Sequence, residues 1–410
     1  MQEQVDSMDI TVDFSNKTRN ELISLCKERD IKGYSRKKKD EIVKLLSIDI
    51  DTVIDTPISL PEKVQRLNYI GSKFQLLDWI TSDMKKKTGW SSFTDKTIGD
   101  IFAGTGIVSY HFRKDRARVI SNDTELYSSI ISHAFTCSTY NETCKTVIDE
   151  FQKDIEEGRH SSTIGYITTH YSPYGSNERK FFTIENAKRI DYIRTKLETI
   201  KNTLSENEYK FIVASILLSS DAVSNVPAVY GCFLKEFKSK ALKDLKLTPI
   251  HTNTLAAVAG SSTYNSDVLN PEFLNSFQAD LVYLDPPYNE RQYSKNYFPL
   301  NAIAKTPERL LSEEPLKGKT GIPTDCFISP FCRRGDTAEK TFDILFRDLK
   351  SKWIFLSYNS ESIVSKETML DLMKKYGTAS VIERDYKRFK SFEYNEDIEI
   401  KEYLFCLEKT

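Results

Sequence analysis

The sequence is poor in the residues that build metal centres and disulfide frameworks. It has five histidines and seven cysteines among 410 residues, and the cysteines form no C-x-x-C pair. Scattered thiols, odd in number, are typical of a reduced cytosolic protein and disfavour a zinc site. We therefore expect no bound metal and a location in a prokaryotic-type cytoplasm.

Long apolar runs and an excess of one charge are also missing. No stretch approaches about 18 apolar residues, and the first residues are polar and acidic, which predicts neither a membrane span nor a secretion signal. The net charge is -1. An anionic partner would therefore have to meet local basic patches.

The most informative stretch is 281–288, Leu-Val-Tyr-Leu-Asp-Pro-Pro-Tyr. Four apolar residues predict a short buried strand that the prolines end, which puts Asp285 in a crevice at the carboxyl edge of a sheet. The Asp285 carboxylate and the Pro286 carbonyl can accept the two N–H bonds of an exocyclic amine. Pro287 stiffens the turn, and Tyr288 offers a face for a planar base. The pattern favours methylation of an amino group on a flat heterocycle; a β-turn with an Asx cap is the alternative.

A glycine turn precedes a predicted amphipathic helix over 74–84. In the turn 67–73, Leu-Asn-Tyr-Ile-Gly-Ser-Lys, Gly71 lets the backbone approach a ligand and Lys73 supplies a cation at a helix start. A loop before a helix often has this composition, so the turn is a weak signal alone.

A second glycine turn lies in 98–106, Ile-Gly-Asp-Ile-Phe-Ala-Gly-Thr-Gly. It predicts a strand, a turn of small residues and a helix from Ile107. Gly104 and Gly106 let the main chain close on a ligand, and Asp100 can accept from an ammonium group. The G-x-G core also occurs in dinucleotide-binding turns, but the third glycine is missing, which disfavours NAD.

Two further acids follow predicted strands. Asp123 follows the strand 118–122, the place where such folds bind ribose hydroxyls; a helix N-cap for 126–134 is the alternative. Asp267 could bond the adenine amine of a cofactor, or cap a helix at 271–276.

The first 47 residues predict a separate helical module. Thr18–Glu21 is a capping box, Ser35 can cap a second helix, and basic side chains cluster at its start: Arg36, Lys37, Lys38 and Lys39. Cations and free N–H groups at a helix start suit a phosphate backbone. The pattern resembles a SAP-type DNA-binding module; a helical hairpin with a solvated basic face is the alternative. Residues 48–62 predict a linker.

Residues 140–262 interrupt the alternation of strands and helices. They predict helices over 185–202 and 206–223, and aromatic and basic side chains alternate over 166–182, where we predict DNA contact by Tyr174. A helical subdomain with its own aromatic core is the alternative. After the central strand, a polar and aromatic segment predicts further DNA contacts at Arg291, Tyr293 and Asn296. A long loop over 313–336 is expected to be functional or mobile.

In their order, these motifs make residues 62–410 resemble the Dam-like alpha group of DNA adenine-N6 methyltransferases, the D12 class. The resemblance rests on Tyr-Ile-Gly-Ser-Lys, then Phe-Ala-Gly-Thr-Gly, an insert, and Asp-Pro-Pro-Tyr last. It implies S-adenosylmethionine as methyl donor, and Asp285 to Tyr288 as the catalytic tetrad. It also implies donor contacts by Tyr69, Lys73, Phe102, Ala103, Gly104, Gly106 and the ribose-binding Asp123.

We therefore expect an α/β protein with a Rossmann-like methyltransferase sheet. The sheet would be built from 63–139 and 263–410, with a mainly helical target-recognition insert at 140–262. The expected partners are double-stranded DNA and, in a restriction–modification system, a cognate endonuclease. Three alternatives stay open: cytosine-N4 methylation, methylation of RNA or a protein amide, and a non-catalytic DNA-binding protein with a methylase fold.

Overall fold

The computed structural model describes residues 18–28, 38–48, 62–311, 316, 318–387 and 399–410. The chain divides into two compact units, Met1–Glu62 and Lys63–Thr410. Among the helices of the described residues, none combines the length and the apolar character that a membrane span requires.

The smaller unit contains two helices, α1 (Arg19–Glu28) and α2 (Lys39–Ile48). The predicted capping box is confirmed: the Thr18 N–H donates to the Glu21 carboxylate at 2.6 Å, and Thr18 Oγ1 accepts from the Glu21 N–H at 3.4 Å. The second helix begins at Lys39, after Lys38, whose N–H donates to the Glu41 carboxylate at 2.8 Å. The predicted cap Ser35 and the basic residues Arg36 and Lys37 lie outside the described residues.

The larger unit is built on one seven-stranded sheet in the order β3-β2-β1-β4-β5-β7-β6. The first five strands in this order are parallel, and β7 is antiparallel to both β5 and β6. The order reverses between β1 and β4, so the crevice at their carboxyl ends is the expected ligand position. The strands are β1 (Thr97–Asp100), β2 (Arg118–Asn122), β3 (Ser262–Tyr264), β4 (Ala279–Leu284), β5 (Ser351–Asn359), β6 (Gly377–Lys387) and β7 (Glu399–Lys409).

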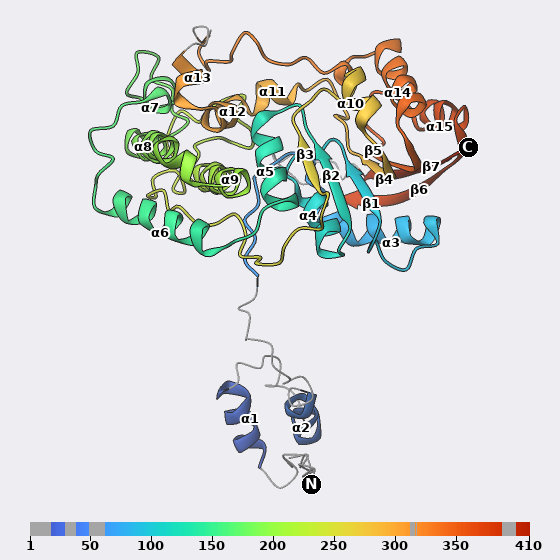
Figure 1. Ribbon diagram of the computed structural model, residues 1–410, viewed down its shortest axis with the longest axis horizontal. Coiled ribbons are helices and arrows are strands. Elements are labelled where there is room, and N and C mark those ends of the chain that lie inside the picture. Colours follow the sequence, from blue (N-terminus) through green and yellow to red (C-terminus); the bar gives the residue numbers. More distant parts are fainter. Residues whose placement is uncertain (1–17, 29–37, 49–61, 312–315, 317, 388–398) are drawn as a thin grey trace, which may run out of the picture. The chain divides into compact units, whose positions relative to one another are not determined.

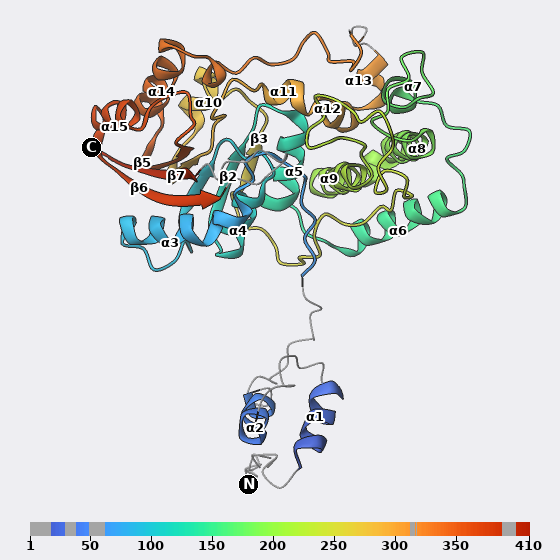
Figure 2. The same cartoon turned by 180° about the vertical axis from the view of Figure 1, so that it is seen from behind.

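Both faces of the sheet are covered, as the continuous apolar run of β4 requires. Leu281 and Tyr283 enter one hydrophobic cluster, while Val282 and Leu284 enter the other, because successive side chains of a strand point to opposite faces. Figures 1 and 2 show helices on both faces. One cluster includes α3 (Leu77–Thr88), α4 (Ile107–Lys114) and α5 (Leu126–Thr136); the other includes α10 (Pro271–Ser276), α14 (Asp336–Asp348) and α15 (Lys366–Lys374).

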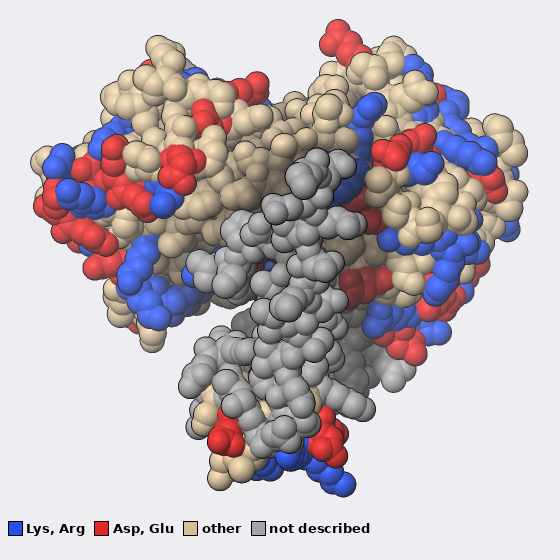
Figure 3. Space-filling model, turned by 60° about the horizontal axis from the view of Figure 1, so that its bottom comes forward, with Lys and Arg blue, Asp and Glu red and all other residues tan. Residues whose placement is uncertain are grey.

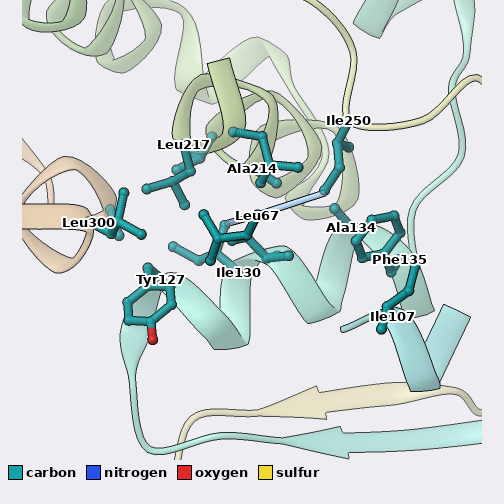
Figure 4. Close-up of a cluster of buried hydrophobic side chains, with 14 of the residues drawn as sticks. Leu67, Ile107, Tyr127, Ile130, Ala134, Phe135, Ala214, Leu217, Ile250 and Leu300 are labelled. Atoms are coloured by element: carbon teal, nitrogen blue, oxygen red, sulfur yellow. The ribbon is translucent and has the colours of Figure 1, made fainter. Parts of the chain in front are cut away.

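The helical insert shares the first cluster with the sheet. Helix α9 is buried from Phe211 to Asp221, and its Ala214 and Leu217 lie against Ile130 of α5, with Leu67 beside them (Figure 4). The remaining elements are α6 (Glu142–Glu156), α7 (Tyr166–Tyr171), α8 (Ile184–Ile200), α9 (Glu206–Ala222), α11 (Tyr293–Asn296), α12 (Phe298–Ala304), α13 (Pro307–Leu311), and the 3-10 turns η1 (Lys73–Leu76), η2 (Lys201–Thr203) and η3 (Pro330–Cys332).

Two sequence interpretations change at this level. The helix predicted from Phe74 begins instead as the turn η1 and becomes α-helical at Leu77. In the insert, Tyr171, Phe181 and Phe182 are fully buried, so for these rings the aromatic core of the subdomain was the right alternative.

Candidate active site

Residues 101–106 follow β1 at the point where the sheet order reverses. They are called the donor turn here because the family resemblance predicts that they bind the methyl donor. Gly104 and Gly106 have φ values of 52° and 69°, in the left-handed region that glycine adopts at least cost. A Cβ on Gly106 would lie 2.9 Å from the Ser132 Cα of α5, and one on Gly104 would lie 3.2 Å from the Tyr69 ring. The two glycines therefore let the turn approach α5 on one side and Tyr69 on the other.

The end of β2 holds this turn in place. Asp123 Oδ2 accepts from the Gly104 N–H at 2.8 Å, and Oδ1 accepts from the Glu125 N–H at 2.9 Å. The N-cap residue of α5 is Glu125, with no side-chain cap. Burial raises the pKa of Asp123, and the backbone N–H groups partly offset that rise. Asp123 thus braces the donor turn.

Asp100, at the end of β1, is a buried acid with an incomplete set of hydrogen bonds. Its Oδ2 accepts from Ser109 Oγ at 2.6 Å, whereas its buried Oδ1 has no donor among the described residues. Burial raises the pKa of Asp100 from 3.8 to about 7, against the hydrogen bond from Ser109. Buried polar atoms are normally paired, so the missing partner makes Oδ1 a candidate acceptor for a ligand's N–H group.

Tyr69 lies in a group of aromatic rings above the donor turn. Its ring stacks on Tyr297 at 4.7 Å and packs on Tyr293 at 5.4 Å between centroids. The Ile70 N–H donates to the Tyr297 hydroxyl at 3.0 Å, and the Tyr293 hydroxyl donates to the Ile70 carbonyl at 3.4 Å. Tyr293, predicted from sequence as a DNA contact, is therefore half-buried beside the donor turn.

The Asp-Pro-Pro-Tyr tetrad follows β4, next to β1. Asp285 Oδ1 receives two donors, the Lys73 ammonium at 3.0 Å and the Tyr288 hydroxyl at 2.8 Å. Lys73 is 4% exposed and also donates to the Gly71 carbonyl at 3.0 Å, and its nitrogen stands 4.7 Å from the Tyr288 ring centroid. Burial raises the pKa of Asp285, while Lys73 and Tyr288 offset part of that rise.

Glu402 is a site residue that sequence reasoning missed. It lies on β7, paired in register with Asn359, and is 7% exposed. Burial raises its pKa to about 6; the charge of Lys73 lowers the pKa and that of Asp285 raises it. The sequence signal was an acid directly before an apolar run (Lys-Glu-Tyr-Leu-Phe), and the pairing of β7 with β5 is what brings it near the tetrad.

The other predicted donor residues have varied surroundings. Gly71 has a φ of 81°, and the Phe102 ring packs edge-on against Phe331 at 5.1 Å. Asp267 Oδ1 accepts from the Leu269 N–H at 3.0 Å. The N-cap of α10 is Asn270, so capping by Asp267 was the wrong alternative for 271–276.

The predicted DNA contacts are spread over several elements. Arg291 is exposed, and Tyr174 keeps half of its surface exposed. Asn296 is half-buried, and its carbonyl accepts from the Tyr230 N–H at 2.7 Å. In the smaller unit, Lys38 and Lys39 are exposed. Within the part of the chain that the structure describes, no group of three or more His, Cys, Asp or Glu residues has a metal-binding arrangement.

Comparison with known proteins assigns this site to a family. Residues 69–372 match the family described as D12 class N6 adenine-specific DNA methyltransferase. The chain belongs to this family. It is 36% identical to the type II methyltransferase M.CviAII of Paramecium bursaria Chlorella virus 1, over 83% of this chain and 98% of that protein. It is also 36% identical to M.NlaIII of Neisseria lactamica, over 84% of this chain and 100% of the relative.

Solved structures add nothing to this assignment. The crystal structure of precorrin-6y C5,15-methyltransferase from Geobacter metallireducens GS-15 covers 81% of this chain and 87% of that chain, at a TM-score of 0.25 and 10% identity. The D12 family assignment and the strand order, not that likeness, support the predicted methyltransferase sheet.

Proposed function

We propose that this D12 protein transfers a methyl group from S-adenosylmethionine to N6 of an adenine that has rotated out of duplex DNA. One observation supports it most. Lys73, four residues after the Tyr69 that covers Gly104, pairs with Asp285 at 3.0 Å. The short segment 69–73 therefore contacts both the donor turn and the tetrad, which supports two molecules bound close together, as in-line transfer requires.

The residues around the donor turn suit a cationic donor. Asp100 presents a buried oxygen that accepts no hydrogen bond from the described residues. Burial raises the pKa values of Asp100, Asp123 and Asp285. Asp100 would accept from the donor's ammonium group, Asp123 would meet its ribose, and Tyr69 would pack on it. Bound there, S-adenosylmethionine supplies a methyl group on a positively charged sulfur.

The tetrad would hold the target amine. Both donors to Asp285 reach Oδ1, so Oδ2 is the oxygen that would accept one amine hydrogen, and the Pro286 carbonyl would accept the other. Lys73 stands over the Tyr288 ring, and the base would stack on the opposite face. With its hydrogens held aside, the N6 lone pair would be free to form the new N–C bond as the carbon–sulfur bond of the donor breaks and leaves a thioether. The N6 proton would then leave through Asp285, whose raised pKa suits brief protonation.

DNA binding would come from patches rather than from overall charge. On the face shown in Figure 3, basic and acidic side chains of the larger unit are interspersed. The insert would read bases, with Tyr174 and Arg291 at the duplex. The N-terminal unit, through Lys38 and Lys39, would act as a SAP-like module that adds salt-sensitive affinity. Since the relatives are named type II methyltransferases, a restriction–modification role is part of the proposal.

Digestion of methylated DNA to nucleosides tests the activity. Plasmid DNA is incubated with the full-length protein and labelled S-adenosylmethionine, then digested and separated. Label in N6-methyladenine supports the proposal. Label in N4-methylcytosine would support the cytosine alternative, and donor binding without transfer of label would support a non-catalytic DNA-binding protein.

A further inference from the structure

The segment Gly318–Gly335, termed here the strap, crosses from the insert to the sheet. It follows α13 and leads into α14, and Figures 1 and 2 show it passing along the same edge of the larger unit as α11. Except for η3 it has no helix or strand. A segment of this length without regular structure needs fastening by side chains, and the strap has three such points.

The first fastening is Arg179 of the insert, which is 2% exposed. Its guanidinium donates to the carbonyls of Gly318 at 3.2 Å and Lys319 at 3.1 Å, and to His170 at 3.0 Å. A Cβ on Gly321 would lie 2.6 Å from the Arg179 Cζ, so the strap passes directly over this cation. Arg179, a basic residue of the aromatic and basic stretch 166–182, is thus a structural anchor.

The second fastening lies on the segment that follows the tetrad. The Gln292 side-chain amide makes two hydrogen bonds to the main chain of Ser329. Its Oε1 accepts from the Ser329 N–H at 2.8 Å, and its Nε2 donates to the Ser329 carbonyl at 3.4 Å. Ser294 Oγ donates to the Phe327 carbonyl at 2.6 Å. The two neighbours of Ile328 are therefore both fixed to the segment that follows the tetrad, residues 289–296, termed here the post-catalytic segment.

The third fastening reaches the donor turn. Phe331 packs edge-on against Phe102 at 5.1 Å, and Cys332 Sγ donates to the Arg291 carbonyl at 3.3 Å. The strap therefore contacts the insert, the post-catalytic segment and the donor turn in succession. Two of the three fastenings hold the strap against residues 291–294, which follow the tetrad in the chain.

Within the second fastening the strap presents an apolar side chain, because Ile328 is 39% exposed. Arg291, next to Gln292, and Arg333 and Arg334, just past the third fastening, are exposed as well, and Arg334 pairs with Glu290 at 3.1 Å. An apolar tip among basic side chains is the form of the wedges that enter a base stack while neighbouring cations meet phosphates.

We propose that Ile328 is a wedge that enters the duplex beside the target adenine and lowers the cost of rotating it out. The inference rests on the proposed function and deepens it. Tyr293, the aromatic candidate from sequence, packs on Tyr69 and bonds Ile70, whereas Ile328 is exposed on a backbone held on both sides. A fixed side chain loses little freedom on entering the stack, which suits this role.

The test compares two short duplexes that carry the recognition sequence found by methylome sequencing. In one, the target adenine is paired with thymine; in the other, it faces an abasic site and is already unpaired. Because unstacking is the cost that a wedge reduces, Ile328→Ala should slow single-turnover methylation of the paired duplex about tenfold and that of the unpaired duplex less than about twofold. Ile328→Leu should restore most of the rate.

Ile344→Ala is the matched control, since Ile344 is 36% exposed on α14 in a hollow lined by residues outside the strap, such as Asn275 and Thr410; it should change neither rate. Equal losses on both duplexes, or no loss on the paired duplex, would overturn the wedge. The wild-type rate on each duplex reports the proposed function itself. Failure of methylation as such is therefore distinguishable from failure of the wedge.

Discussion

The insert and the carboxyl edge of the sheet both bury acids, but they satisfy them differently. In the insert, Asp191 accepts four hydrogen bonds: from the N–H groups of Gly165, Ile167 and Thr168 and from Thr168 Oγ1, at 2.6–3.1 Å. At the sheet edge, Asp100 keeps one oxygen without a donor among the described residues. Unsatisfied buried groups are costly. The first acid therefore completes the fold, while the second is the one that we propose to meet a ligand.

The largest effect is expected at Asp285, the acid that we propose to hold the target amine. Asp285→Ala should lower methylation by about a hundredfold to a thousandfold or more, because no other carboxylate takes its hydrogen-bonding role. Donor affinity, measured by calorimetry, should stay within a few-fold. Asp280→Ala is the control from the other end of β4, where Asp280 only accepts from the Thr97 N–H. Turnover of Asp285→Ala within about tenfold of wild type would reject this assignment.

The same substitution in the two acids should change stability in opposite directions. Asp191→Asn replaces one acceptor oxygen by an NH2 group that faces N–H donors. The substitution should therefore lower the free energy of unfolding by about 2–4 kcal/mol. Asp100→Asn removes a buried charge at an oxygen without a donor. Its folded-state pKa is raised to about 7, so the wild-type protein loses stability as pH rises from 3.8 through 7, and at pH 8 the variant should be more stable by on the order of 1–3 kcal/mol.

Urea denaturation at pH 8, in the absence of S-adenosylmethionine, measures both changes in the free energy of unfolding. The Asp100→Asn variant should pair its gain in stability with weaker donor binding. If both variants are destabilised equally, the contrast between structural and ligand-binding acids is wrong.

Donor affinity should depend on pH through Asp100. Its carboxylate attracts a cationic donor only when ionised, and its pKa is about 7. As pH falls from 8 to 6 the carboxyl gains a proton, so the donor Kd should rise by up to about tenfold. Calorimetry across this range should show that dependence in wild type and a flatter profile in Asp100→Asn. An equally steep profile in the variant would assign the titration to another group.

The smallest effect is expected at Glu402. Glu402→Gln keeps the volume but removes a negative charge near Lys73, so Lys73 should hold Asp285 more tightly and kcat for DNA should fall roughly fivefold, about 1 kcal/mol. Glu383→Gln on β6 is the control, since Glu383 pairs with Lys366 and Lys401 on the surface. If the Glu402→Gln variant has wild-type kinetics, the proposed role of Glu402 in the site is wrong.

Local pattern predicted the parts of the site that depend on local chemistry. The run before Asp285 and the turn around Gly104 follow from periodicity and from glycine and proline. What the sequence could not predict depends on distant contacts. Arg179 is buried because the strap returns to it, and Tyr293 is half-buried because it meets Tyr69.

Contacts between regions also explain why the insert boundary is not a packing boundary. Asp221 of α9 accepts from the Asn68 N–H at 3.1 Å and from the Tyr230 hydroxyl at 2.8 Å. This links the insert to the residue next to Tyr69. Composition marks where the insert begins and ends in sequence, but not that it shares a core with the sheet.

Long-read sequencing of DNA from cells that express the protein tests the central claim most directly. With wild type, we predict N6-methyladenine at one recurring sequence, and with Asp285→Ala none above background. Modified cytosine at that sequence, or unchanged adenine methylation in the variant, would contradict a site in which Asp285 holds the adenine amine for methyl transfer.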